Sequence, residues 1–88
     1  MTDRETIQML AEKVMGIAPA VAAQLFLWNP LTDANATLEC LERMDSWSRI
    51  GSKVDVCWKS CKWFRSSCND FKIDACRAMI AAVEGRDA

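Results

Sequence analysis

The stretch KVDVCWKSCKWFRS, residues 53–66, decides the fold, because its apolar side chains alternate with polar ones. Val54, Val56 and Trp58 fall on one side of an extended chain, and mostly polar side chains fall on the other. Successive side chains of a β-strand point to opposite faces, so this period of two predicts a half-buried strand.

A chain reversal at Lys59 and Ser60 would fold the stretch into a β-hairpin with Val56 opposite Trp63. Two-residue turns of this kind set the register of the strands that they join. The hairpin would then have one apolar face, wide enough to seat helices, made of Val54, Val56, Trp58, Cys61 and Trp63.

Signals for other elements lie on both sides of this hairpin. Thr2 and Glu5 form a capping-box pattern, and Gly85 suits a left-handed helix end. Helices are expected over residues 3–15, 33–44 and 71–83, with N-caps at Thr2, at Thr32 or Asp33, and at Asn69 or Asp70. Strands are expected near residues 47–50, 53–58 and 61–65, with a turn at 51–52 and a short extended piece near 24–28.

The second helix has an expected core stripe of Ala34, Leu38, Leu41 and Met44 or Asp45. Strands grouped between helices predict an α+β domain with a three-stranded antiparallel meander and three helices. The 88 residues suffice for one hydrophobic core, so residues 1–88 are expected to form a single domain.

Charge is distributed unevenly along the chain, although the formal net charge is only −1. Residues 1–48 hold three basic and seven acidic side chains, whereas residues 49–77 hold seven basic and three acidic ones. Such asymmetry is typical of a binding face for an acidic partner, and it also arises by chance in short chains.

The residue types present restrict the chemistry of the chain. It has no histidine, so it lacks the commonest general base and the commonest metal ligand. Its five cysteines form an odd set without the spacing of a zinc site, and we expect buried, reduced thiols. We therefore expect no metal, no cofactor and no enzymatic activity.

The expected location is the cytoplasm. The first residues, MTDRETIQ, are polar and acidic, unlike a signal peptide. No apolar run approaches the roughly 20 residues of a membrane span.

Three further segments occur in the order AEKVMG (11–16), WNPLTD (28–33) and ACRAMIAAVEG (75–85). Together they resemble the phage ABA sandwich domain, a family of small phage and prophage proteins. Leu31 stands where the family usually has serine, and Lys72 and Ile73 replace its usual Pro-Glu pair. The resemblance implies an α/β/α-type sandwich and a phage origin, and it implies no catalytic residues.

Basic and aromatic side chains interleave from residue 47 to residue 65, the pattern of a partner-binding surface. On the predicted register Phe64 shares the polar face with Lys62, where its ring would be exposed in a monomer, which favours a partner or a homodimer. The candidate partner-binding residues are Arg49, Lys53, Lys59, Lys62, Phe64 and Arg65. The alternative is that the tryptophans belong to the core and the lysines solvate the sheet.

A second candidate site is a small pocket framed by Trp28, Asn29 and Asp33, because amides at a helix N-terminus attract anions. The alternative is a capped turn with a tryptophan anchor.

These patterns favour a small, phage-encoded, non-enzymatic interaction protein. By analogy with phage counter-defence, it would bind and block a bacterial defence complex, a host protein or ribonucleoprotein, as anti-CRISPR proteins do. Two alternatives are a sponge that sequesters a nucleotide signal, acting as a homo-oligomer, and a nucleic-acid-binding module.

Overall fold

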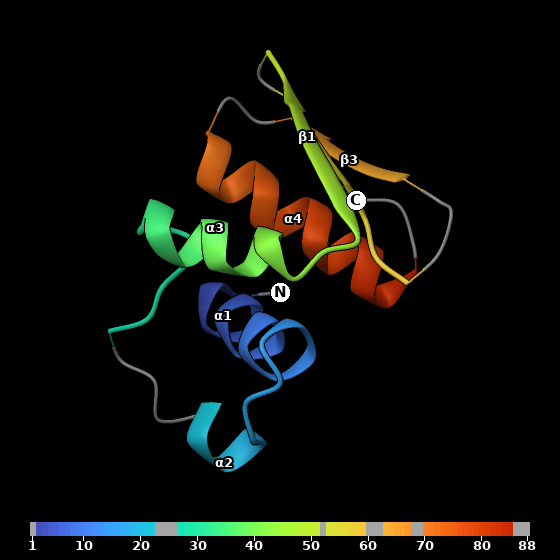
Figure 1. The fold of residues 1–88 in the computed structure, drawn as a ribbon. Helices are drawn as coiled ribbons and strands as arrows, with labels where there is room; N and C mark the ends of the chain where they lie inside the picture. Colours follow the sequence, from blue (N-terminus) through green and yellow to red (C-terminus); the bar gives the residue numbers. More distant parts are fainter. Residues whose placement is uncertain (1, 23–26, 52, 60–62, 68–69, 86–88) are drawn as a thin grey trace.

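A computed structural model describes residues 2–22, 27–51, 53–59, 63–67 and 70–85 of the chain (Figure 1). The described part contains helices and one three-stranded sheet, which confirms the α+β class. The elements in chain order are α1 (Asp3–Met9), the π-helix η1 (Leu10–Val14), α2 (Pro19–Ala22), α3 (Ala34–Glu42), β1 (Ser46–Ile50), β2 (Lys53–Cys57), β3 (Trp63–Ser67) and α4 (Phe71–Glu84).

The three strands form the predicted antiparallel meander, in the order β1-β2-β3. Ile50 pairs with Lys53, so two residues join β1 to β2. Gly51 has a φ of 61°, a conformation that glycine adopts without steric cost.

The register of the second hairpin differs from the prediction by one residue. Val56 pairs with Phe64, not with Trp63, and Trp63 pairs with Cys57. Because side chains alternate along a strand, this shift exchanges the two faces of β3. The prediction for the faces of β3 was wrong: Phe64 is 3% exposed inside the protein, and Trp63 is 50% exposed outside it. The cause is the connection, since β2 ends at Cys57 and β3 begins only at Trp63.

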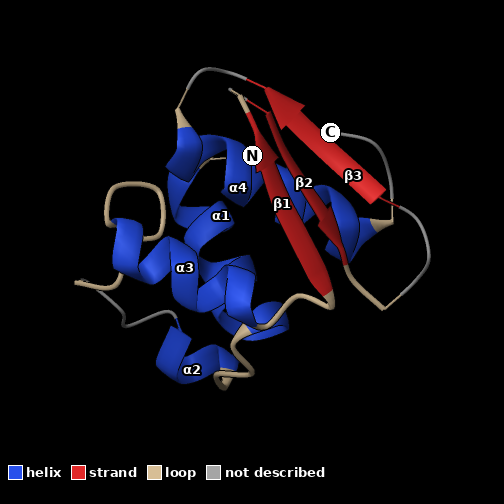
Figure 2. Ribbon diagram, turned by 45° about the horizontal axis from the view of Figure 1, so that its top comes forward, coloured by secondary structure: helices blue, strands red, loops and turns tan. Residues whose placement is uncertain are grey.

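The layers place the sheet at one side of the protein and the helices at the other (Figure 2). α4 packs against β2 and β3, and α3 and η1 pack against α4 from behind. This layering differs from a sheet held between two helical layers, because the described helices cover one face only. The core between them includes Leu10, Val14, Leu41, Val54, Val56, Phe64, Cys76 and Met79.

Three of the described helices begin at residues that carry capping signals, and α4 also ends at one. The capping box of Thr2 and Glu5 is formed, and Asp33 and Asp70 accept amide hydrogen bonds at the N-termini of α3 and α4. Gly85 ends α4 in the left-handed conformation with a φ of 74°. α4 has more buried residues than any other described helix, in line with its wide apolar arc.

The predicted short strand near residues 24–28 is not present in the part of it that is described. Leu27 and Trp28 belong to no strand, and residues 24–26 lie outside the described residues. Upstream, Pro19–Ala22 forms the helix α2, so the described chain has four α-helices where three were predicted. Proline suits the first position of a helix because its missing N–H would lack an intrahelical partner there.

Candidate functional site: the outer face of the sheet

One face of the sheet has no helix packed on it among the described elements, and we call it the outer face. Val54, Val56, Phe64 and Ser66 point toward α4 and are buried, so their neighbours along β2 and β3 point the other way. The outer face consists of Ser46, Ser48, Ile50, Lys53, Asp55, Cys57, Trp63 and Arg65.

Asp55 and Arg65 form a fixed charge pair in the middle row of the outer face. Arg65 donates to both carboxylate oxygens, from Nε at 2.7 Å and from Nη2 at 3.0 Å. These hydrogen bonds lower the pKa of Asp55 and raise that of Arg65. An exposed pair contributes little to stability, but its two-point geometry holds both side chains in one orientation.

Two large apolar side chains stand at opposite corners of this face. Trp63 is 50% exposed and lies in one row with Cys57 and Ser46, whereas Ile50 is 63% exposed and lies beside Lys53. Trp63 is the larger of the two, and aromatic side chains are enriched at protein contact surfaces.

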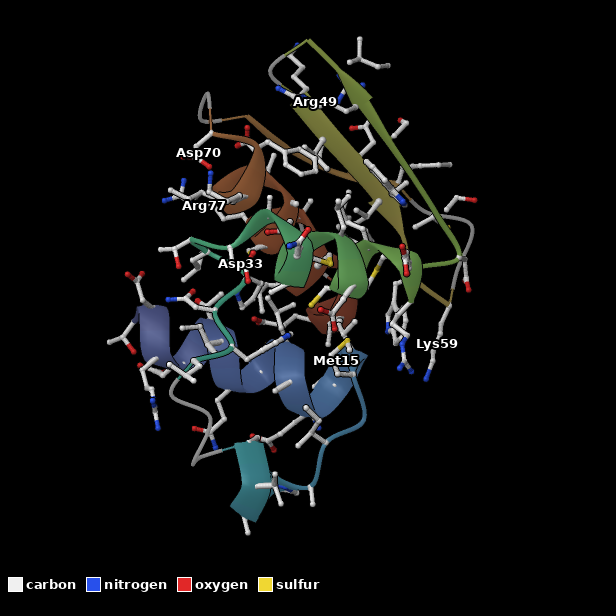
Figure 3. All side chains as sticks on the ribbon, turned by 60° about the vertical axis from the view of Figure 1, so that its left-hand side comes forward. Met15, Asp33, Arg49, Lys59, Asp70 and Arg77 are labelled. Carbon is white, nitrogen blue, oxygen red and sulfur yellow. The ribbon has the colours of Figure 1, made fainter. Side chains whose placement is uncertain are left out.

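The predicted basic residues are not brought together on one surface. Lys53 and Arg65 lie on the outer face, but Arg49 and Lys59 lie at opposite ends of the sheet (Figure 3). Phe64 was predicted to be exposed with them, and this prediction was wrong because the register turns it inward. Lys62 lies outside the described residues.

Arg49 belongs to an aromatic cluster at the start of α4. Its guanidinium carbon lies 5.0 Å from the centroid of the Phe71 ring, and the Trp47 ring lies 6.2 Å from the same ring. Cation–π contacts of this kind orient the guanidinium, so Arg49 points away from the outer face.

Lys59 has a structural role at the end of β2. Its amide donates to Asp45 Oδ2 at 2.7 Å, and its ammonium lies 4.9 Å from the Trp58 ring. Its φ of 52° is in the left-handed region, which costs energy for a residue with a Cβ.

Lys59→Gly is therefore expected to be more stable than Lys59→Ala by about 1 kcal/mol, since both lack the ammonium and only alanine keeps the strain. Urea denaturation of the two variants measures this difference. Equal stabilities, or a more stable alanine variant, would show that the backbone at this position is unstrained.

The turn with Trp28, Asn29 and Asp33 uses its own polar groups internally. Asn29 Oδ1 accepts from the amide of Leu31 at 2.9 Å, and Asp33 Oδ1 accepts from the amide of Asn35 at 3.0 Å. Trp28 is partly buried against the core. The arrangement matches the capped turn that was the alternative to a ligand pocket.

The carbonyl of Pro30 ties this turn to two helices. It accepts from the Thr37 hydroxyl at 2.6 Å and from the Cys76 thiol at 3.4 Å. Burial raises the pKa of Cys76 to about 12, and burial together with Glu39 raises that of Cys40 to about 12. Neither thiol is therefore a thiolate at neutral pH, and both act as core side chains.

Comparisons of the chain with protein-family models, with curated proteins and with solved structures gave no match. Within residues 2–22, 27–51, 53–59, 63–67 and 70–85, no three acidic or cysteine side chains gather as metal ligands would. The helices in these ranges are too short or too polar to cross a membrane.

Sequence reasoning missed Trp63 as the exposed aromatic residue of this surface. The alternation shows that Trp63 and Phe64 face opposite ways, but it does not show which of them faces the helices. The length of the connection decides that, and its length was predicted wrongly.

Proposed function

We propose that this chain is a non-enzymatic interaction protein that covers a site on another protein with the outer face of its sheet. The observation that carries the proposal is Trp63, half exposed on a face over which no described helix packs. Tryptophan and arginine are the residues most enriched among those that dominate binding energy, and Trp63 stands two residues from Arg65 on this face.

The partner is a protein surface with an apolar recess for the Trp63 ring and a carboxylate for Lys53. Arg65 is already engaged by Asp55, so Lys53 is the described cation of this face that stands outside the bidentate pair. A mixed surface of this kind, aromatic with paired charges, is typical of protein–protein interfaces.

The setting of this binding is taken from the resemblance to phage ABA sandwich proteins. We propose a phage-encoded inhibitor that acts in the bacterial host and blocks a defence complex, a host protein or ribonucleoprotein, as anti-CRISPR proteins do. The three motifs that carry the resemblance lie away from the outer face. AEKVMG covers the end of η1, WNPLTD forms the turn at Pro30, and ACRAMIAAVEG lies in α4 and its C-cap.

A nucleic-acid or nucleotide ligand is less well supported than a protein. The Asp55 carboxylate stands in the middle row of the outer face, where it would repel a phosphate backbone. A surface depression along α1 and η1 is lined by Glu5, Gln8, Met9, Glu12 and Lys13, so two carboxylates face one ammonium. An anionic nucleotide fits neither place.

The test is affinity capture of the tagged chain from phage-defended bacterial cells, read by native mass spectrometry. Wild type is expected to retain one host protein in fixed stoichiometry and to raise phage plaque counts on these cells. The double variant Lys53→Glu, Trp63→Ser is expected to bind at least about 30-fold more weakly, because truncating a tryptophan that dominates the binding energy typically costs 2 kcal/mol or more.

The matched control is Lys13→Glu with Leu38→Ser, which makes the same charge change and removes an exposed apolar side chain from the helical side. This control should bind and protect phage as wild type does. Equal losses in both double variants, or no loss in the outer-face variant, would contradict the assignment. Capture of a nucleotide or of a nucleic acid in place of a protein would support the nucleotide-signal sponge or the nucleic-acid-binding module.

A further inference from the structure

β1 is an edge strand of the described sheet, and its inward-pointing charge, Arg49, is held against the Phe71 ring. Among the strands that the structure describes, β1 pairs with β2 alone, and its five residues, SWSRI, include no proline and no lysine. An unprotected edge offers backbone N–H and C=O groups to another strand.

The register shows which backbone groups point to the open edge. Ile50 and Lys53 flank a two-residue turn, where an antiparallel hairpin forms a hydrogen-bonded pair. Because hydrogen-bonded and non-hydrogen-bonded pairs alternate, the N–H and C=O groups of Trp47 and Arg49 point away from β2. The edge thus has two donors and two acceptors, placed symmetrically about Ser48.

The inner side of β1 is also less covered than that of its neighbours. α4 packs against β2 and β3, and it leaves Trp47 37% exposed beside Arg49 and Phe71. The aromatic cluster of Trp47, Arg49 and Phe71 is therefore open toward the edge of the sheet.

We propose that two copies of this chain associate through β1, antiparallel about a two-fold axis at Ser48, and so form a continuous six-stranded sheet. In this register Trp47 of each copy faces Arg49 of the other, with four backbone hydrogen bonds between them. The Arg49 guanidinium then lies between its own Phe71 ring and the Trp47 ring of the second copy, two favourable cation–π contacts.

The chemistry of the strand favours a second copy as the occupant of the edge. A two-fold contact needs a self-complementary patch, and the Trp47 and Arg49 side chains complement each other across the axis. An axis at Arg49 would place like charges opposite each other, and an axis at Trp47 would pair fewer residues of the five-residue strand. The axis at Ser48 is the register that pairs all five.

The outer face stays exposed in such a dimer, because strand pairing extends the sheet sideways. The two outer faces become one surface with two Trp63 side chains. Dimerisation is therefore independent of the proposed partner binding and can be tested without a partner.

Sedimentation velocity of the full chain over a range of concentrations tests the dimer. The apparent mass is expected to rise from 9.9 kDa toward twice that value. Ser48→Lys and Ser48→Glu should each weaken the dimer about tenfold or more, because like charges meet at the axis. An equimolar mixture of the two variants should restore it, since opposite charges then face each other.

Ser46→Lys is the matched control, because residue 46 faces Ile50 of the second copy and no like charge. It should change the dimerisation constant by less than about threefold. Far-ultraviolet circular dichroism checks that each variant is folded. A wild type that stays monomeric, a Ser48→Lys variant that dimerises normally, or variants that fail to recombine would each overturn the proposal.

Discussion

Replacing Phe64 with alanine is expected to lower the free energy of unfolding by about 3–5 kcal/mol, the usual cost of removing a buried phenylalanine ring. Phe64 is 3% exposed on the inner side of β3, and it belongs to the core between the sheet and α4. A small domain typically has a stability of about 5–15 kcal/mol, so this variant would lose a large part of it. Urea denaturation followed by circular dichroism measures the change.

Trp63→Ala is the control for this experiment, because Trp63 is the neighbouring aromatic residue on the opposite face. It is 50% exposed, and its loss is expected to cost about 1–2 kcal/mol, since only part of its apolar area is buried. The register first expected from the sequence predicts the opposite order of the two costs. A larger loss for Trp63→Ala would therefore show that β3 pairs one residue away from the register described above.

Replacing Thr37 with valine is expected to lower the free energy of unfolding by about 1–3 kcal/mol. The side chain is fully buried, and its hydroxyl donates to the Pro30 carbonyl at 2.6 Å. Valine has nearly the same shape but no donor, so the carbonyl keeps only the weak Cys76 thiol. The change thus removes the hydrogen bond and leaves the packing of α3 nearly intact. Thermal and urea denaturation both report the loss.

Thr32→Val is the matched control, because Thr32 is exposed in the same turn. Its cost is expected to stay within about 0.5 kcal/mol. If Thr37→Val were as harmless as Thr32→Val, the turn would not depend on this bond, and the assignment of residues 28–33 as structural would lose its main support.

The helices α1, α3 and α4 could be predicted from the sequence because their signals are local. The Thr2 and Glu5 capping box, the Asp33 and Asp70 N-caps and the Gly85 C-cap each involve residues within one helical turn. The first hairpin was predictable for the same reason, since Gly51 marks its turn.

The features that were predicted wrongly depend on contacts distant in sequence. Along α3 the buried residues are Ala36, Thr37, Cys40 and Leu41, whereas the expected core residue Leu38 is 38% exposed. Small side chains let α3 approach the alanines of α4 closely, and no pattern within α3 reveals that neighbour. The predicted register of β3 was wrong for a similar reason, because no sequence pattern reveals the length of the connection between β2 and β3.

The candidate site was predicted in part. Lys53 lies on the outer face as the alternation indicates. Arg65 lies there because β3 is shifted by one residue from the predicted register, and Trp63 takes the exposed place expected for Phe64. Arg49 could not be placed from the sequence, since its position depends on Phe71, which is 22 residues away and packs beside it.

The most direct test of the central claim is hydroxyl-radical footprinting of Trp63 in the isolated chain and in the complex captured from defended cells. Strong oxidation of Trp63 in the isolated chain and strong protection in the complex are expected, with Leu38 on α3 equally reactive in both. The β1 dimer leaves Trp63 exposed, so protection would report the partner alone. Equal oxidation of Trp63 in both samples would contradict binding through the outer face.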